Sequence, residues 1–459
     1  MQFLSSMRSL GPRYGALWVG QTISQFGTNI AVITIPLLIL HIQERSGDLS
    51  AFEFSIAYAA ETAPTLLIGL VGGVLLDRIH LRPVMIATDL LRACAFFYLA
   101  AGVDSFGVAT VFVMAFLIGS MTTMFDAGLY AMIPALVPKH RLSDANSYIT
   151  ASIQTMMALG PLLGGVTVYL SGTPAIGLFV NGVTFVLSAW ILKYVGRVPH
   201  HGDVDGPRLP FTSDFAAGLR HIWEEPRLRI STISSAVPNF VIGFLEATFV
   251  VLFTVVIQTE TEAQIGILYS FMGIGGLIGA LLAPKVTRLL GLGRSMTSGL
   301  ALAGVALFAF MFTTYGALAM GLLALFMFGV SVVNIPLATI RQVYAGEKML
   351  GRVISAARAI GWATLPLGAL IGGWLGDTES TYPWIARLFP LILIGCALWL
   401  FTTIIWTDAF GPEFKRGSHT AAAWTTDDAE TDPSEPPIEG EPDGSVPDGP
   451  TSSDEPTAE

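Results

Sequence analysis

The sequence predicts an all-α polytopic membrane protein with twelve transmembrane helices. Of its 459 residues, 53% are hydrophobic and only 13% are charged, whereas a soluble protein of this length carries about 25% charged residues. Apolar runs of about 18 residues or more, the length needed to cross a bilayer, recur from end to end. Because these runs are continuous and not alternating, they exclude a β-barrel.

The apolar runs fall into two groups of six. Their expected positions are residues 14–40, 54–76, 83–103, 106–133, 147–170, 174–196, 231–257, 264–288, 295–314, 317–340, 351–376 and 384–407. The fifth run contains GPLLGG and the eleventh contains LPLGALIGG, so each has a proline followed by a glycine pair. This weak repeat predicts two pseudo-symmetric six-helix bundles, residues 1–197 and 230–408.

Basic residues set the expected orientation. Of the 24 Lys and Arg residues, 20 lie on one side of the predicted membrane. They lie in the loops after the second, fourth, eighth and tenth spans, in the linker with its flanks, or near the two ends of the chain. Loops rich in Lys and Arg stay on the cytoplasmic side of a membrane. We therefore expect a multi-pass protein of the cell membrane with both termini in the cytoplasm.

Two segments lie outside the bundles. In the linker 198–229, Phe215, Leu219, Ile222 and Trp223 share one face of a helix, which predicts a short amphipathic helix on the membrane surface. The tail 409–459 is rich in Pro, Asp, Glu, Ser and Thr, a composition typical of disorder. From residue 417 the tail carries twelve acidic residues, and without them the net charge changes from −10 to +2.

Several classes of function are disfavoured. The overall acidity comes from the tail, so the charge does not indicate a nucleic-acid partner. Neither cysteine suggests a metal site or a disulfide framework. We find no catalytic set and no Walker phosphate loop, so we expect neither an enzyme, nor a bound cofactor, nor a metal.

One stretch resembles a family signature. Residues 72–83 read GGVLLDRIHLRP, which is similar to the Gly-x-Leu-x-Asp-Arg-x-Gly-Arg-Arg motif between helices 2 and 3 of the major facilitator superfamily. The matching residues are Gly73, Leu75, Asp77, Arg78 and Arg82. His80 replaces a glycine of the motif and Leu81 replaces a basic residue.

Longer stretches resemble one branch of that superfamily. Residues 124–147, 179–192, 215–229 and 351–373 are similar to macrolide-efflux proteins and the enterobactin exporter, and the resemblance covers about residues 10–408. It implies proton-driven efflux of an amphipathic small molecule, such as a drug, an antibiotic, a siderophore or another secondary metabolite. The expected partners are the lipid bilayer and this substrate, and we expect a monomer.

Two family features of antiporters are incomplete. GPLLGG resembles the helix-5 antiporter motif, but Met156 stands where that motif has a further glycine. Many antiporters also carry an arginine in helix 4 that takes part in proton coupling, and the run 106–133 has none. An uptake permease of the same fold therefore remains an alternative, as does a non-transporting membrane protein that docks a partner through its acidic tail.

Besides Asp89, which lies near the end of its span, three carboxyl groups lie within the predicted spans. They are Glu246, Asp126 and Glu61. A charge in the membrane is expensive, about 2.5–3.5 kcal/mol on insertion scales, and marks a functional site by default. Because burial favours the neutral form of a carboxyl group, each of the three is a proton-coupling candidate. The alternative is a structural carboxylate that hydroxyl groups or an arginine satisfy.

Amide side chains are candidates for lining a substrate cavity. Gln21, Gln25 and Asn29 recur every four residues and so share one helix face. Asn181, Asn239 and Asn334 are weaker candidates of the same kind. Hydrogen bonds between helices are the alternative use of such residues in membranes.

Charges near the signature motif predict a gate. Asp89 and Arg92 share a helix face, and we expect them to form one network with Asp77, Arg78 and Arg82. In the family interpretation, Asp77 meets the positive start of helix 11 around Arg352. The alternative is that these arginines only keep the loop in the cytoplasm.

Glycines in three spans predict close contacts between helices. These contacts either have only a structural role or also allow the two halves to move against each other during transport. The residues are Gly160, Pro161, Gly164, Gly165, Gly275, Gly279, Gly368 and Gly372.

Overall fold

The computed structural model describes residues 10–47, 50–76, 80–138, 141–196, 211–255, 262–346, 349–376 and 387–403. Within these ranges the chain forms helices and no strand. The first helices are α2 (Pro12–Ser46), α3 (Ala51–Leu76), α4 (Leu81–Ala101), α5 (Val108–Leu136), α6 (Leu142–Ser171) and α7 (Pro174–Leu192), followed by the short η2 (Lys193–Val195). The later helices are α8 (Phe211–Glu224), α9 (Pro226–Val255), α10 (Glu262–Leu290), α11 (Leu292–Phe310), α12 (Gly316–Ala345), α13 (Leu350–Gly376) and α15 (Leu391–Phe401).

The lengths of these helices fit a bilayer. Ten described helical stretches are long and apolar enough to cross a membrane. Helix α3, with 26 residues, and the shorter α15, with 11, bring the series to twelve. The prediction of an all-α polytopic membrane protein is confirmed. Of the last predicted span, 384–407, residues 387–403 are described, and they contain α15.

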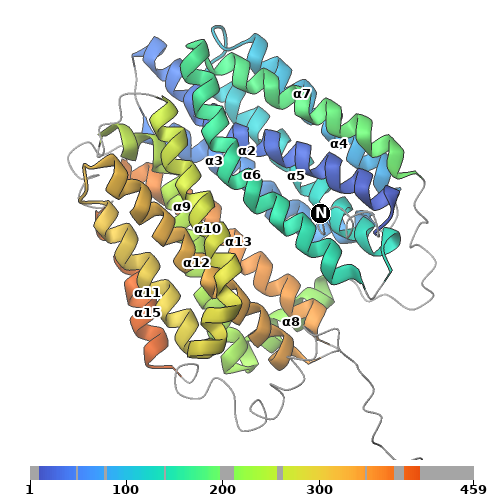
Figure 1. Cartoon of the computed structure of the whole chain (residues 1–459), viewed down its shortest axis with the longest axis vertical. Helices are drawn as coiled ribbons and strands as arrows, with labels where there is room; N and C mark the ends of the chain where they lie inside the picture. Colours follow the sequence, from blue (N-terminus) through green and yellow to red (C-terminus); the bar gives the residue numbers. More distant parts are fainter. Residues whose placement is uncertain are drawn as a thin grey trace, which may run out of the picture. The chain divides into compact units, whose positions relative to one another are not determined.

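The helices pack as two sets. We call α2 to α7 the N-half and α9 to α13 with α15 the C-half (Figure 1). In the N-half, α7 packs on α2 and α4, and α5 packs on α3 and α4. In the C-half, α12 packs on α10 and α11, while α13 packs on α9. The large apolar side chains between these helices include Phe96, Phe185 and Phe326, which are almost fully buried.

The two halves touch most extensively through two helix pairs, α6 with α10 and α3 with α13, and α3 also contacts α9. Glycines make these contacts close. A Cβ atom added at Gly273 of α10 would meet the backbone of Ala158 in α6, and one at Gly373 of α13 would meet Ser55 in α3. Ser55 and Gly373 lie at the ends of their helices that are remote from the clusters of basic residues. We call the end with those clusters the basic end, and it is marked by Arg82, Arg141 and Arg288.

The predicted amphipathic helix is α8. Its Ile222 is 1% exposed and packs in an apolar cluster with Leu228 of α9 and Val353 of α13. A Cβ atom at Gly218 would meet the backbone of Arg352, so α8 lies directly against α13. Residues 197–210 and the tail from 404 lie outside the described residues, so the proposed boundaries at 197 and 409 stay predictions. The proposed boundary at 229 falls inside α9, which begins at Pro226.

Candidate functional sites

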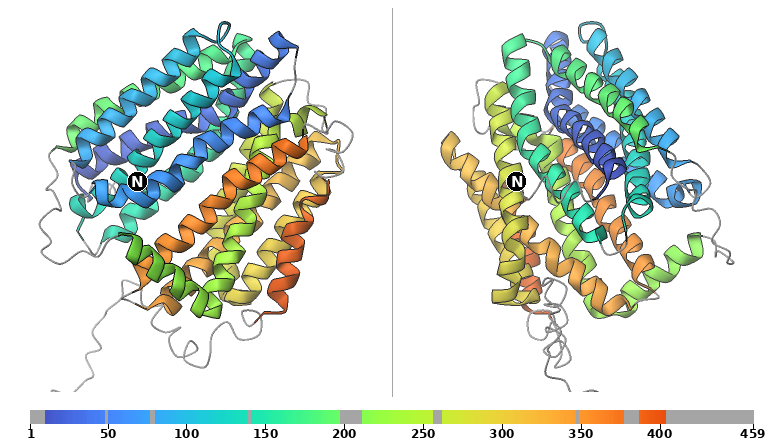
Figure 2. Two further views of the ribbon diagram at one scale, coloured as in Figure 1. Left: turned by 180° about the vertical axis from the view of Figure 1, so that it is seen from behind. Right: turned by 45° about the vertical axis from the view of Figure 1, so that its right-hand side comes forward.

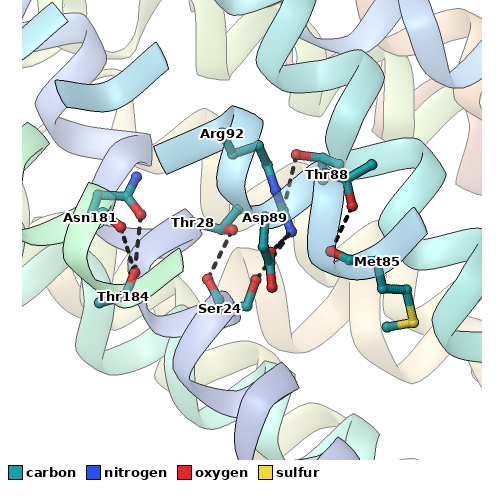
Figure 3. Close-up of polar contacts among 9 residues, drawn as sticks. Ser24, Thr28, Met85, Thr88, Asp89, Arg92, Asn181 and Thr184 are labelled. Atoms are coloured by element: carbon teal, nitrogen blue, oxygen red, sulfur yellow. Dashed lines mark hydrogen bonds and ion pairs between the residues drawn. The ribbon is translucent and has the colours of Figure 1, made fainter. Parts of the chain in front are cut away.

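An ion pair lies in the interior of the N-half. Asp89 and Arg92 of α4 are 0% and 1% exposed and bond to each other through one carboxylate oxygen and one guanidinium nitrogen (Figure 3). Arg92 also donates to Ser24 of α2 and Thr122 of α5, each at 3.4 Å. Its guanidinium carbon lies 4.6 Å from the ring centroid of Phe125 and 4.2 Å from that of Phe185. Arg92 of α4 therefore contacts side chains of α2, α5 and α7.

This pair is from here on called the buried ion pair. Several buried polar atoms of the same helices have no described hydrogen-bond partner: Oδ2 of Asp89, Nε of Arg92, both side-chain polar atoms of Gln21, Nδ2 of Asn181 and Oγ of Ser188. All belong to α2, α4 or α7 and to residues with less than 2% exposure. Buried polar atoms that lack a protein partner commonly hold internal water. The region is a polar core inside one half.

The amide stripe of α2 lies mostly in this interior. Gln21 is fully buried and Asn29 is 8% exposed. Nδ2 of Asn29 donates to the backbone oxygen of Gln25, and Gly160 of α6 packs on Asn29. Gln25 is half-buried. Neither Gln21 nor Asn29 lines a described cavity, because the close α2–α6 and α2–α7 contacts cover their face of α2.

The other amides have separate roles. Oδ1 of Asn181 accepts a hydrogen bond from Thr184 (Figure 3). This pair packs against Gly27 of α2. Nδ2 of Asn239 donates to the backbone oxygen of Gly361 at 2.9 Å and so joins α9 to α13. Asn334 of α12 is exposed. These six amides do not gather at one site.

Asp126 of α5 lies between arginines from the two halves. It is half-buried, and the basic side chains that attract its carboxylate are Arg92 and Arg358 of α13. The guanidinium carbon of Arg358 lies 6.0 Å from the ring centroid of Tyr130 and 5.4 Å from that of Trp362. Tyr130 follows Asp126 by one helical turn, so Arg358 approaches the same face of α5.

Glu61 and Glu246 line one cavity of about 220 Å³ that both halves share. Glu61 comes from α3 and Glu246 from α9, both are half-buried, and they are close enough to repel each other electrostatically. The other lining residues are Ala31, Val32, Ile33, Ile35, Pro36, Ile39, Phe54, Ala57, Tyr58, Thr62 and Tyr269. None of these described lining residues is basic. We call this site the acidic cavity.

The signature residues are only partly described. Asp77 and Arg78 lie outside the described residues, and Gly73 lies in the last part of α3, where no side chain is described. Arg82 donates to the backbone oxygens of Leu192 and Lys193, at 3.2 and 2.7 Å. It thus binds the carboxyl end of α7, where the helix dipole attracts a cation.

The expected single gate network is therefore divided. The buried ion pair lies between helices of the N-half, while Arg82 lies at the end of α7. Arg352 is half-buried at the start of α13, and its Nη1 approaches the sulfur of Met349 at 3.6 Å. The expectation of one network fails for the described residues, because α4 places Arg82 and Arg92 almost three turns apart.

The glycines occupy helix contacts. Within the halves, a Cβ atom at Gly160 or Gly164 would meet α2, one at Gly275 or Gly279 would meet α12, and one at Gly368 or Gly372 would meet α9. Between the halves, Gly266 of α10 lies against the backbone of Pro161 and Gly165. The motif GPLLGG therefore packs on α2 with one face and on the C-half with another.

Sequence reasoning missed Arg358, Tyr58 and Tyr269 as site residues. A charged residue within an apolar run was a signal for Arg358, but nothing local to α13 indicates that it faces α5. The two tyrosines are common in apolar runs and gave no signal. Only the packing of helices from both halves brings these residues to the sites, as in the contacts of α3 with α13 and α9 and of α10 with α2.

The comparisons with known proteins agree with this architecture. A family model, that of the Major Facilitator Superfamily, matches residues 17–366. The multidrug efflux pump Tap of Mycolicibacterium fortuitum is 28% identical over 80% of this chain and 90% of its own length. The enterobactin exporter EntS of Escherichia coli O1:K1 / APEC is 24% identical over 86% of this chain and 93% of its own.

Solved structures show the same fold. A bacterial homologue of the human lysosomal transporter Spinster, in an inward-facing and unoccupied conformation, aligns with a TM-score of 0.64 and 13% identity, over 85% of this chain and 97% of its own. A point mutant of the nucleoside transporter NupG aligns with a TM-score of 0.66 and 13% identity, over 84% of this chain and 100% of its own. With the family model matching most of its length, the chain belongs to the Major Facilitator Superfamily of transporters.

Proposed function

We propose that this transporter is a proton-coupled exporter of an amphipathic small molecule and that it works by alternating access. The acidic cavity carries this proposal. It holds two mutually repelling carboxyl groups, and none of its described lining residues supplies a positive charge. Two carboxylates in such surroundings cannot both stay ionised without a counter-ion. The smallest available counter-ion is a proton, so the proton gradient is the proposed energy source, with no bound cofactor.

The position of the acidic cavity supports coupling. Glu61 belongs to the N-half and Glu246 to the C-half, so a movement of one half against the other changes the distance between them. Loss of a proton from the acidic cavity favours separation of the two carboxylates, and binding of a proton favours their approach. Asp126 is a second candidate, because the Arg358 that faces it comes from the other half.

The basic end supports the proposed orientation. Arg82, Arg141, Arg229 and Arg288 lie at this end of the helices, which is the cytoplasmic end by the positive-inside rule. The proposed location is therefore the cell membrane, with both termini in the cytoplasm. The halves touch at the opposite ends of α3 and α13, through Ser55 and Gly373.

The names of two relatives support export. Tap is named as a multidrug efflux pump and EntS as an enterobactin exporter. Apolar and aromatic side chains surround the two carboxyl groups, and such walls accept neutral or cationic amphipathic molecules better than phosphorylated ones.

Everted membrane vesicles test the proposal, with ethidium as the probe. We expect energised vesicles that contain the protein to accumulate ethidium, and we expect a protonophore to abolish this accumulation. Substitution of Glu246→Gln removes the exchangeable proton and should abolish accumulation too. The matched control is Glu44→Gln, because Glu44 is an exposed carboxylate at the end of α2 and should not be needed.

Three outcomes would contradict the proposal. They are accumulation that survives the protonophore, accumulation that Glu246→Gln leaves unchanged, and ethidium movement out of everted vesicles, which indicates an uptake permease. Absence of any movement for a panel of neutral and cationic probes would favour the non-transporting alternative.

A further inference from the structure

A second cavity, of about 250 Å³, lies where α8 meets α9 and α13. It is lined by Ile222, Trp223, Arg229, Thr232, Ile233, Ala236, Val237, Phe240, Ile360 and Thr364. Helix α8 lies across the basic ends of α9 and α13 (Figure 2). The cavity therefore belongs to α8 and the C-half and is separate from the acidic cavity. We call it the α8 groove.

The length of the α8 groove matches one leaflet of a bilayer. Its α9 wall runs along one helix face from Arg229 to Phe240, which is a distance of about 16 Å at 1.5 Å per residue. The hydrocarbon core of a bilayer is about 30 Å thick, so one leaflet is about 15 Å deep. The groove thus reaches from the membrane surface to about the middle of the membrane.

The wall of the α8 groove presents carbon atoms. Its two hydroxyl groups are already used, because Thr232 donates to the backbone oxygen of Leu228 and Thr364 to that of Ala236, at 2.8 and 2.9 Å. Apart from Arg229, the other wall residues along α9 and α13 are aliphatic or aromatic. A narrow apolar groove of this depth fits a hydrocarbon chain.

Arg229 is the charged residue among the described lining residues of the α8 groove. Nη1 of Arg229 donates to the backbone oxygen of Trp223 at 3.2 Å. The nearby carboxylates are already paired, Glu224 with Arg220 at 2.7 Å and Glu225 with Arg227 at 3.4 Å. In the described part of the chain, Arg229 forms no ion pair, and its guanidinium keeps further donors for an anion. Trp223, which is 54% exposed, is the residue type that favours the membrane interface.

We propose that the α8 groove binds an anionic phospholipid from the leaflet at the basic end. One acyl chain lies along α9, and the phosphate accepts hydrogen bonds from Arg229. Because the chain would contact α8, α9 and α13 together, the lipid holds α8 against the C-half. This site does not depend on the direction or the coupling of transport.

Lipid retention by the purified full-length protein tests this site. The probes are dioleoyl phosphatidylglycerol and dioleoyl phosphatidylcholine, each added to the protein in detergent and counted by native mass spectrometry. We expect the wild type to retain phosphatidylglycerol more tightly. Arg229→Gln should weaken this binding about tenfold, the usual scale for loss of a hydrogen bond to a charged group.

Two further variants complete the test. The matched control is Arg288→Gln, because Arg288 also donates to a backbone oxygen at the basic end but lines no described cavity. Its lipid binding should equal that of the wild type. Ala236→Phe fills the groove and should reduce binding of both lipids, with thermal unfolding reporting whether it folds.

Equal retention of the two lipids by the wild type would overturn the proposal. So would phosphatidylglycerol binding that Arg229→Gln and Arg288→Gln reduce equally, because this would indicate a general effect of surface charge. If Ala236→Phe does not fold, the comparison of the two arginine variants still decides the outcome.

Discussion

The buried ion pair and the acidic cavity place membrane carboxyl groups in opposite situations. Asp89 lies inside the N-half, bonded to an arginine from its own helix. Glu61 and Glu246 lie in a cavity between the halves, and the described lining includes no cation. Arg92 also reaches Ser24 and Thr122, so several helices of one half hold it.

The difference separates structural charges from exchangeable ones. A carboxylate with a fixed cation keeps its charge and holds its half together. A carboxyl group with no fixed cation must take a counter-ion from solution, and a site between moving halves can release it again. The location of a carboxyl group relative to the two halves is therefore more informative than its depth in the membrane.

The largest expected effect is on folding, at the buried ion pair. Arg92→Gln leaves the Asp89 carboxylate buried without its partner, which should cost about 3–5 kcal/mol. Thermal unfolding of the purified protein should show little folded material. The double variant Asp89→Leu with Arg92→Met removes both charges and should recover much of the lost stability. No recovery in the double variant would show that the pair itself is required.

A fixed cation in the acidic cavity should abolish transport without unfolding the protein. Thr62→Lys places an ammonium group beside Glu61 and Glu246, where it replaces the exchangeable proton permanently. We expect ethidium accumulation in everted vesicles to fall at least tenfold, which corresponds to a free-energy change of about 1.4 kcal/mol or more. Thr62→Met, of similar length but uncharged, is the control. Equal losses in the two variants would indicate a steric effect.

Two glycines of α10 allow a contact within one half to be compared with a contact between the halves. Gly275 lies against Ala324 of α12, and Gly273 lies against Ala158 of α6. Gly275→Ala should lower the free energy of unfolding by about 1–3 kcal/mol through overpacking. Gly273→Ala should leave folding nearly unchanged and slow ethidium transport, because it hinders closure of the halves. An equal decrease in the free energy of unfolding in the two variants would mean that the halves fold as one unit.

Arg358 should couple to Asp126 across the halves. Arg358→Gln should reduce ethidium transport several-fold, on the scale of about 1 kcal/mol for a partly exposed charge pair. In the Asp126→Asn background the same substitution should have little further effect, because its partner has lost its charge. Additive losses in the double variant would exclude this coupling.

The smallest effect is expected for the tail. Deletion of residues 417–459 removes twelve acidic residues but none of the transmembrane spans. Ethidium accumulation by the truncated protein should stay within about twofold of the full chain, the range of a change below 0.5 kcal/mol. A larger loss would favour a docking role for the tail.

The helices were predictable from the sequence because length and hydropathy are local properties. The span expected at 54–76 is helix α3 (Ala51–Leu76), and the amphipathic pattern around Phe215 to Trp223 lies in α8. Helix ends were less accurate, as at α6, which begins at Leu142 and not at the expected residue 147.

The sites were less predictable because distant helices build them. The sequence marked Glu61 and Glu246 separately, but only the contact of α3 with α9 places them in one cavity. The regular spacing of Gln21 and Asn29 suggested a cavity wall, whereas the structure turns both residues into the N-half. Periodicity shows which residues share a helix face but does not show what covers that face.

Proton release by the purified full-length protein tests most directly whether the acidic cavity holds an exchangeable proton. A pH indicator in weakly buffered detergent solution reports protons that ethidium binding displaces. We predict release from the wild type, and no release from the double variant Glu61→Gln with Glu246→Gln, although both remain folded. Release of the same size from the wild type and the double variant would contradict the account.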